Sequence, residues 1–408
     1  MLDAKTMEII KSTAPVLQKN SEAIGKRFYQ LLFTNHPELL NVFNHSNQKR
    51  GLQQRSLAHS VYVSGEHIDH LEDIKPLIMR IAHKHRALGI LPEQYPVVGE
   101  NLIQAVKDVL GDGATDEIIQ AWVKAYDYIA NQFIEIEQKL YEQQRTEEGN
   151  WEGFREFVVD KKVKESDVIT SFYLKPKDKK AIASFQPGQY LTVKMNIPGE
   201  KFTHHRHYSL SDAPGKDYYR ISVKREDARN GDPAGIVSTY LHENIQEGDV
   251  LEFSSPAGDF VLDTESMNPV VLISGGVGFT PLMSMLNTIV EKQPDRDVTY
   301  IHAAINGKYH AMKDHVNSLT AKHDRLKSYV IYETPTEEDQ AEKAFDKEGL
   351  IDQAWLETVV ENTEADFYLC GPIPFMEVVY SALRNMNVDE SRIHYEAFRP
   401  LSTMDTDK

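Results

Sequence analysis

The sequence has little of several features that whole classes of protein require. Its single cysteine, Cys370, cannot close a disulfide within the chain or supply a thiolate metal cluster, which fits a reducing compartment. No run approaches the roughly 20 consecutive apolar residues of a membrane span, and charged residues interrupt the start of the chain, unlike a signal peptide. We therefore expect a cytoplasmic protein with no stable membrane insertion.

Basic side chains are also fewer than acidic ones. Lys and Arg number 45 against 62 Asp and Glu, which gives a formal net charge of −17. This excess of negative charge disfavours attraction to nucleic acid or to anionic lipid. We expect a monomer whose partners are small molecules and not nucleic acid.

The 408 residues correspond to several domains at the roughly 100 to 200 residues typical of one. Apolar residues recur with helical period across 1–145, and the polar stretch EQQRTEEGN at 142–150, which has no periodicity, predicts a linker. Short β-like segments separated by turn residues then predict a small antiparallel barrel across 151–262. Strands alternate with helices across 263–408, which predicts an α/β domain with a parallel sheet.

Two histidines lie close together in the helical part. At about 100° per residue, His85 shares a face with Ile78, Ile81 and Leu88, whereas His83 points away from that face. Taken alone, a histidine on an apolar face is more often a core residue satisfied by a backbone carbonyl than a metal ligand. The surrounding sequence favours the ligand.

An apolar slot with a polar group is predicted near this helix. A turn opened by Pro37 places Phe43 at a corner, and a later helix carries Gln53 and Leu57 four residues apart on one face. Tyr29 could add a phenol to the slot, although a lone tyrosine is more often core packing.

In this order and spacing, the segments KRFYQLLF, NVFNHSNQ, IAHKH and PEQYPVVGENL resemble a bacterial flavohemoglobin, and the likeness covers the whole chain. The resemblance implies an all-α globin domain with haem b, followed by an antiparallel β-barrel FAD domain and a ferredoxin-reductase-like NAD(P)-binding α/β domain. It implies that His85 holds the iron and that Phe43 lies against the macrocycle. Tyr29, Gln53 and Leu57 would lie on the distal side.

The same resemblance assigns Tyr95 and Glu137 to a proximal triad with His85, and it counts Lys84 among the catalytic residues. A carboxylate that accepts a hydrogen bond from the imidazole raises the basicity of the ligand and favours activation of oxygen over its storage. Because Glu135 lies only two residues away, a solvated helix face is the alternative explanation for Glu137.

A basic, aromatic and hydroxyl cluster follows a β-like segment that contains Pro187, Gly188, Gln189 and Tyr190. The RxYS pattern is a flavin motif of the ferredoxin-reductase type. Arg206 would supply a planar cation to a pyrophosphate, Tyr208 an aromatic plane against the isoalloxazine, and Ser209 a hydroxyl near flavin N5. We count His207 and Tyr190 with these cofactor-binding residues.

A second candidate for FAD binding is the start of a helix in GIVSTYLHENI. Gly235 opens this helix, and Val237, Ser238 and Thr239 form its first turn, where free backbone N–H groups can receive phosphate oxygens.

The segment LISGGVGFTPLMSML reads as an apolar strand, a glycine loop and a helix that begins near a proline, which predicts a dinucleotide loop. The residues assigned to it are Gly275, Gly276, Val277, Gly278, Phe279, Thr280 and Pro281. In YLCGPIPFM, the resemblance places Cys370, Gly371 and Pro372 beside the nicotinamide. For Cys370, a buried small apolar residue is the alternative.

The segment HYEAFRP ends the fold. By resemblance, Phe398 stacks over the flavin, Glu396 lies near flavin and haem, and Ala397, Arg399 and Pro400 belong to the cofactor site. Many relatives have Cys where Ala397 stands and Gly where Arg399 stands, so this chain departs from the pattern there.

The function implied is nitric oxide dioxygenase, in which NO and O2 yield nitrate while NAD(P)H supplies electrons through FAD and haem b. Flavin is needed because a hydride carries two electrons and haem iron accepts one. Two alternatives stay open: an oxygen-binding or redox-sensing haemoprotein whose flavin domain reduces its own iron, and a general NAD(P)H reductase.

Overall fold

The computed structural model describes residues 2–43, 52–229, 231 and 233–398. The chain divides into two compact units. The first is Met1–Phe154 with Thr192–Arg206, and the second is Arg155–Leu191 with His207–Lys408. Among the described residues, no helix has the length and apolar character needed to cross a membrane.

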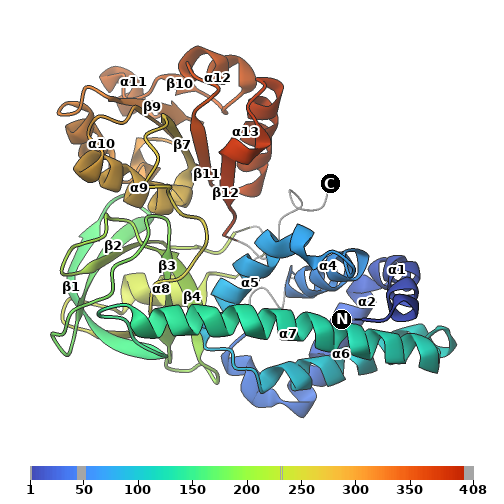
Figure 1. The fold of residues 1–408 in the computed structure, drawn as a ribbon. Helices are drawn as coiled ribbons and strands as arrows, with labels where there is room; N and C mark the ends of the chain where they lie inside the picture. Colours follow the sequence, from blue (N-terminus) through green and yellow to red (C-terminus); the bar gives the residue numbers. More distant parts are fainter. Residues whose placement is uncertain (1, 44–51, 230, 232, 399–408) are drawn as a thin grey trace. The chain divides into compact units, whose positions relative to one another are not determined.

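The first unit is built mainly from helices, as predicted (Figure 1). They are α1 (Ala4–Lys19), α2 (Ser21–Asn35), α4 (Leu52–Glu66), α5 (Lys75–Leu88), α6 (Gln94–Leu110) and α7 (Asp116–Thr146), with short 3-10 turns at η1 (Pro37–Asn41), η2 (Leu71–Ile74) and η3 (Gly111–Gly113). The apolar faces of α1, α2, α4, α6 and α7 share one core, in which Ile10, Phe28, Leu32 and Trp122 are buried, and Ile78 of α5 packs with η2 in a second cluster. Burial of these faces stabilises the helices more than their intrinsic propensity does.

Helix α7 continues through most of the stretch that was expected to be a linker. It ends at Thr146, and Gln144 in its last turn is 6% exposed. The Gln144 amide donates a hydrogen bond to the main-chain oxygen of Trp151, and Arg145 pairs with Glu152. Polar contacts therefore hold the last turn, which explains why apolar periodicity did not reveal it.

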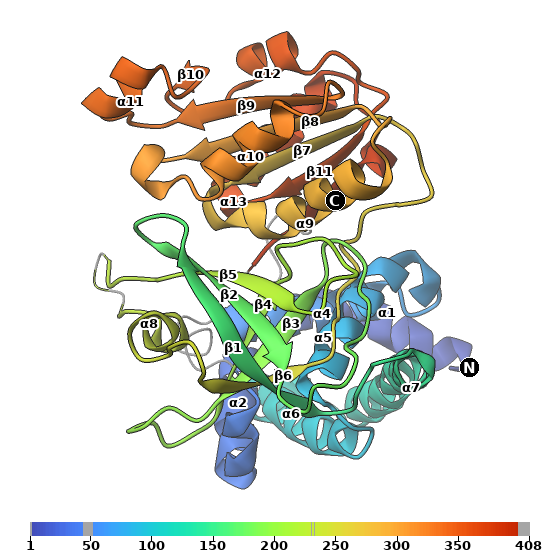
Figure 2. The same ribbon diagram turned by 90° about the vertical axis from the view of Figure 1, so that its left-hand side faces the viewer.

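The FAD-type region forms a six-stranded sheet in the order β4-β3-β6-β1-β2-β5 (Figure 2). Its strands are β1 (Phe154–Lys164), β2 (Ile169–Pro176), β3 (Tyr190–Met195), β4 (His204–Ser209), β5 (Tyr219–Lys224) and β6 (Val250–Ser254), and α8 (Ile236–Glu243) lies between β5 and β6 in the chain. β1 pairs antiparallel with β2, and β2 with β5. The predicted antiparallel domain is confirmed.

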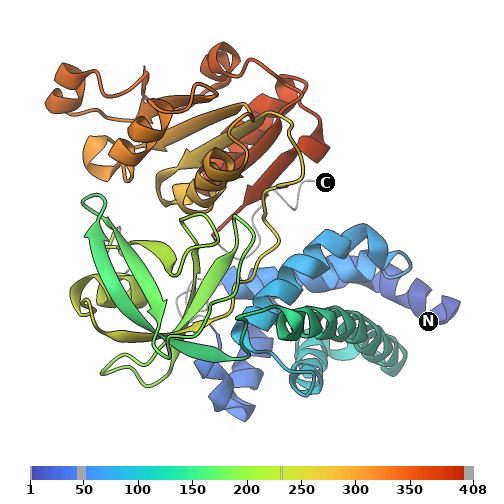
Figure 3. The ribbon, with the colours of Figure 1, turned by 60° about the vertical axis from the view of Figure 1, so that its left-hand side comes forward.

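The C-terminal region is a parallel sheet in the order β10-β9-β8-β7-β11-β12, with helices on its faces (Figure 3). The elements are β7 (Val270–Gly275), η4 (Gly276–Gly278), α9 (Phe279–Lys292), β8 (Val298–Ala304), η5 (Gly307–Tyr309), α10 (Lys313–Thr320), β9 (Leu326–Tyr332), α11 (Glu337–Glu342), β10 (Lys347–Glu348), α12 (Gln353–Val359), β11 (Asp366–Cys370), α13 (Ile373–Asn385), η6 (Glu390–Arg392) and β12 (Ile393–Glu396).

Alternate residues of β7 belong to different cores. Val270 and Leu272 pack with α9, whereas Val271 and Ile273 pack with α13. Because successive side chains of a strand point to opposite faces, a strand buried on both faces reads as a continuous apolar run. Burial on both faces explains why β7 appears in the sequence as the unbroken apolar run PVVLI.

Candidate functional site

The structure brings His85, Tyr95 and Glu137 together from three helices. Nδ1 of His85 lies 2.7 Å from Oε1 of Glu137 and 3.0 Å from the hydroxyl of Tyr95. The Tyr95 hydroxyl donates to the same Glu137 oxygen at 2.6 Å. Two donors therefore converge on one carboxylate oxygen, which leaves the imidazole proton on Nδ1 and a lone pair on Nε2.

Helix packing decides which glutamate takes part. Glu137 is 2% exposed on the buried face of α7, whereas Glu135 is exposed. Burial, followed by the charge of Glu137, raises the pKa of the Tyr95 phenol, so this group stays a proton donor. Tyr126 on α7 donates to the main-chain oxygen of Tyr95 at 2.7 Å and ties the start of α6 to α7.

These groups suit the ligation of a haem iron. The side chain of His85 stays 32% exposed although Ile78 and Ala82 of the same helix are buried, and no described residue bonds to its Nε2. Within the described part of the chain, no three His, Cys, Asp or Glu side chains are grouped as metal ligands. An imidazole by itself holds iron firmly only when a macrocycle supplies the other donors, which is the arrangement in haem proteins.

The predicted distal residues lie partly in one aromatic cluster. The ring of Tyr29 is 5.6 Å from that of Phe43, edge to face, and also packs on Phe33. Phe43 and Leu57 are half-buried against the helical core. Gln53 lies on α4, but its side chain is outside the described residues. Lys84 is half-buried on α5, next to His85 in sequence.

Two of the predicted flavin-binding side chains meet directly. The rings of Tyr190 on β3 and His207 on β4 have their centroids 4.8 Å apart. Arg206 and Tyr208 are half-buried, and Ser209 is 7% exposed at the end of β4. Tyr190 comes two residues after Gly188.

The start of α8 fits a phosphate-bearing ligand. The hydroxyl of Thr239 is buried and has no hydrogen-bond partner among the described residues, although such groups are normally satisfied. Ser238 is different, because its hydroxyl already bonds to Glu226 N and Gly235 O, both at 3.2 Å. Val237 is buried in the core beneath the helix. A bound phosphate oxygen would satisfy the Thr239 hydroxyl and the free N–H groups of this first turn.

The glycine loop and the second nucleotide motif touch each other at the centre of the parallel sheet. Strand order reverses between β7 and β11, and in open α/β sheets ligands bind at the carboxyl ends of strands at such a point. Gly276 has φ +53°, a conformation that glycine adopts without strain. A Cβ on Gly278 would lie 2.2 Å from the main-chain oxygen of Cys370.

The other residues of this pair of motifs are placed as follows. Phe279, Thr280 and Pro281 form the buried first turn of α9, Val277 lies in the 3-10 turn before it, and Gly371 and Pro372 follow β11. Cys370 is fully buried, and burial, followed by the charge of Glu396, raises the pKa of its thiol. The side chain is therefore a neutral thiol.

The C-terminal segment returns to the same edge of the sheet. Glu396 on β12 is in register with Cys370 on β11. Ala397 is half-buried, and Phe398 is 47% exposed, so among the described residues its ring is open to a cofactor. Arg399 and Pro400 lie outside the described residues.

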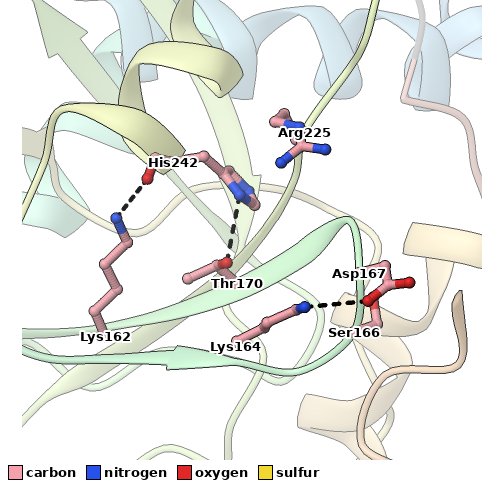
Figure 4. Close-up of a pocket in the computed structure, with 7 residues that line it drawn as sticks. All are labelled: Lys162, Lys164, Ser166, Asp167, Thr170, Arg225 and His242. Carbon is pink, nitrogen blue, oxygen red and sulfur yellow. Dashed lines mark hydrogen bonds and ion pairs between the residues drawn. The ribbon is translucent and has the colours of Figure 1, made fainter. Parts of the chain in front are cut away.

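A separate polar cavity of about 360 Å³ opens beside α8 (Figure 4). Two of its basic side chains are bonded to groups nearby. Lys162 donates to the carbonyls of His242 and Ile245 at the end of α8, and Lys164 pairs with Asp167. The lining residues include none of those that the sequence assigned to a cofactor.

Sequence reasoning missed a buried polar junction in the second unit. Asp212, in the loop between β4 and β5, is bonded to Ser284 and Asn287 of α9. No motif marks these residues, because each is a common residue type whose significance comes from a partner about 70 positions away.

Family models match three parts of the chain: globin at residues 26–133, oxidoreductase FAD-binding domain at 156–262, and oxidoreductase NAD-binding domain at 272–381. A globin joined to these two modules defines a haem-containing flavin oxidoreductase. Its cofactors are haem, FAD and a nicotinamide dinucleotide.

The closely similar relatives carry one name. The chain is 54% identical to a flavohemoprotein of Bacillus thuringiensis subsp. konkukian, over 99% of this chain and 100% of that one. It is 51% identical to a flavohemoprotein of Bacillus subtilis, over 98% of each. This chain belongs to the flavohemoprotein family, which confirms the resemblance seen in the sequence.

Solved structures agree. A flavohemoglobin from Malassezia yamatoensis with bound FAD and haem matches with TM-score 0.85 at 27% identity, over 97% of this chain and 99% of that one. The flavohem-like FAD/NAD-binding domain of a nitric oxide dioxygenase from Vibrio cholerae matches with TM-score 0.55 at 40% identity, over 60% of this chain and 98% of that one.

Proposed function

We propose that this flavohemoprotein is an NAD(P)H-dependent nitric oxide dioxygenase. The observation that carries the proposal is the buried Glu137 carboxylate, which accepts hydrogen bonds from both His85 Nδ1 and Tyr95. An oxygen carrier needs no such charge behind its proximal histidine, whereas oxygen activation benefits from it. The relative from Vibrio cholerae that is named a nitric oxide dioxygenase adds support.

When bound, the haem supplies the centre at which NO and O2 combine to nitrate, and FAD divides the hydride of NAD(P)H into the single electrons that this centre needs. Overall, two NO, two O2 and one NAD(P)H give two nitrate, one NAD(P)+ and one proton. The chain has to hold each group and control protons around it.

On the proximal side, Glu137 accepts the proton that His85 carries on Nδ1, and in this tautomer the lone pair that can hold iron is on Nε2. Tyr95 satisfies the carboxylate from a second direction and restricts its movement. We propose Tyr29 and Gln53 as hydrogen-bond donors to the dioxygen substrate. Each such bond is worth roughly 1 to 3 kcal/mol when the acceptor gains charge.

On the reductase side, the loop at Gly276 and Gly278 lets the dinucleotide pyrophosphate approach the backbone. Thr239 and the start of α8 would receive an FAD phosphate. We propose that the protein works in the cytoplasm, since its one cysteine is a buried thiol that forms no disulfide. We also propose that it is a monomer and that its substrates are NO and O2.

The test is to mix NO with the aerobic, NAD(P)H-reduced holoprotein in a stopped-flow instrument and to follow NO, nitrate and NAD(P)H together. We expect rapid nitrate formation with two NO consumed per NAD(P)H. A stable oxygenated spectrum without nitrate would identify a carrier or sensor instead. A His85→Ala variant that loses haem and keeps the full rate at which the parent reduces its physiological acceptor with NAD(P)H would identify a general reductase.

A further inference from the structure

The loop between β4 and β5 docks on one face of α9. Ser284 Oγ donates to the main-chain oxygen of Asp212 at 2.7 Å, and Asn287 Nδ2 donates to Asp212 Oδ1 at 2.8 Å. One turn further along, Glu291 pairs with Lys216 of the same loop at 2.7 Å. Because these three helix positions are spaced by three and then four residues, their side chains lie on one face. The loop thus joins the FAD-binding region to the nucleotide-binding region.

Asp212 is held as a charged group although it is only 8% exposed. Burial alone would raise its carboxyl pKa, but the charge of Arg220 and hydrogen bonds from Tyr218, Ala213 N and Asn287 outweigh burial and lower the pKa below its usual value. Arg220 itself is 5% exposed, 3.4 Å from Oδ2. A paired, hydrogen-bonded charge of this kind resists displacement, since any movement leaves a buried ion unsatisfied.

The hydrogen bonds also have a fixed direction. The ionised Asp212 carboxylate can only accept, so Asn287 Nδ2 must face it and Asn287 Oδ1 faces His315 Nε2 at 2.8 Å. Burial lowers the pKa of His315, and its neutral ring makes this second bond when the proton is on Nε2. A flipped amide would turn its oxygen toward the carboxylate and lose the bond to Asp212.

We infer that Asn287 and Ser284 are positioning residues for hydride transfer, because they fix α9 and its preceding glycine loop against the region that binds the flavin. The inference rests on the proposed function, in which NAD(P)H gives a hydride to FAD and leaves as NAD(P)+ while FAD becomes reduced by two electrons. α9 begins directly after Gly278, so the loop and the helix move as one rigid element.

The junction acts through distance and not through contact with substrate. Hydride transfer needs the two reacting rings to be held close, and a misplacement of about 1 Å can cost about 100-fold in rate. Nucleotide affinity depends on the loop itself, whereas the hydrogen bonds of the junction are made to Ser284 and Asn287, further along α9. Loosening the junction should therefore slow the transfer of the hydride without weakening the binding of NAD(P)H.

The first test measures anaerobic reduction of flavin by NAD(P)H in the holoprotein, by stopped-flow absorbance over a range of NAD(P)H concentrations. For Asn287→Asp, we expect the limiting rate to fall by about 10- to 100-fold, with a dissociation constant for NAD(P)H within about twofold of the parent. Asn317→Asp, the same chemical change at an exposed position of α10, is the matched control and should leave both values unchanged.

A pH profile distinguishes positioning from a general loss of structure. The groups around the junction that titrate or carry charge are Arg220, Tyr218, Asp212, Lys216, His315, Glu291 and Lys322. In Asn287→Asp, two carboxyl groups share one site, so one of them has a raised pKa and can donate a hydrogen bond once protonated. The defect relative to the parent should therefore shrink as the pH falls from about 8 to about 5.

Ser284→Ala keeps the inference testable if Asn287→Asp does not fold, because it removes only the bond to the Asp212 main chain. Its limiting rate should fall in the same sense, with faster hydrogen exchange in the loop around Asp212 and in α9. An unchanged limiting rate in both variants, a loss confined to NAD(P)H affinity, or an equal loss in Asn317→Asp would overturn the inference. Since no NO is present, failure of the dioxygenase proposal would not affect this result.

Discussion

The replacement Glu137→Gln tests how much the buried carboxylate contributes. The amide has almost the same shape, and its oxygen can still accept from His85 and Tyr95, so the change removes the charge and little else. A hydrogen bond to a charged group contributes roughly 1.5 to 3 kcal/mol, against about 0.5 to 1.5 kcal/mol for a neutral pair. Two bonds together should lose about 2 kcal/mol, and if this charge acts in the transition state, the loss corresponds to about 30-fold in rate at about 1.4 kcal/mol per factor of ten.

The assay is NO consumption by the haem-loaded variant, compared with its NAD(P)H-dependent reduction of ferricyanide. We expect NO turnover to fall by about 10- to 100-fold and the reduction of ferricyanide to be unchanged, because only the proximal side is altered. Fold stability should change little, since the amide is easier to bury than the carboxylate whose bonds it replaces.

Glu135→Gln is the matched control, because Glu135 is exposed two residues away on the same helix. It should turn over NO at the parent rate. If Glu137→Gln retains full haem content and its NO turnover stays within twofold of the parent, the charge behind His85 has no catalytic part and the reasoning fails.

Three further perturbations have defined outcomes. Gly278→Ala would place a Cβ 2.2 Å from Cys370 O. The rate of flavin reduction by NAD(P)H should therefore fall, and the melting temperature should drop by an amount that reflects about 1 to 3 kcal/mol. Gly113→Ala is the control, because its Cβ meets no atom within 4 Å, and it should change neither the rate nor the melting temperature. Thr239→Val removes a buried hydroxyl that lacks a partner, so the apoprotein should be at least as stable while FAD titration shows about tenfold weaker binding. Burial lowers the pKa of His302 from 6.5 to about 4, so between these pH values the unfolded chain binds a proton at this site that the folded chain does not. In denaturant unfolding, this site should contribute a loss of stability of up to about 3 kcal/mol as the pH falls from 6.5 toward 4. Because burial also lowers the pKa of His310, whose ring centroid is 4.6 Å away, His302→Asn should reduce the total loss and not abolish it.

Much of the reductase could be predicted from local sequence. The run PVVLI and the glycine loop placed β7 and the start of α9 correctly, because an apolar strand, glycines and a helix-opening turn are all local signals. β9 and β12 were not identified from the sequence. Strand β9 mixes exposed and buried positions, so it has neither clear alternation nor a continuous apolar run.

In the helical region, periodicity placed His85 on the apolar face, and the resemblance supplied its role. Spacing alone could not choose between Glu135 and Glu137, and the choice of Glu137 came from the resemblance. The choice depends on how α7 turns against α5, and the two bonded residues His85 and Glu137 are 52 positions apart. The polar end of α7 was missed for a related reason, since its contacts are hydrogen bonds and ion pairs that leave no hydrophobic period.

The sequence by itself determined the order of the three regions, the kind of cofactor each would hold and the helix face on which His85 lies. These features depend on residues within one turn, one strand or one loop of each other. Only the tertiary structure showed that Glu137 is buried and bonded to His85, that Gly278 must pass close to Cys370, and that Asn287 bonds to Asp212. Such pairs form when distant elements pack, and their residue types are too common to reveal a partner until the chain has folded.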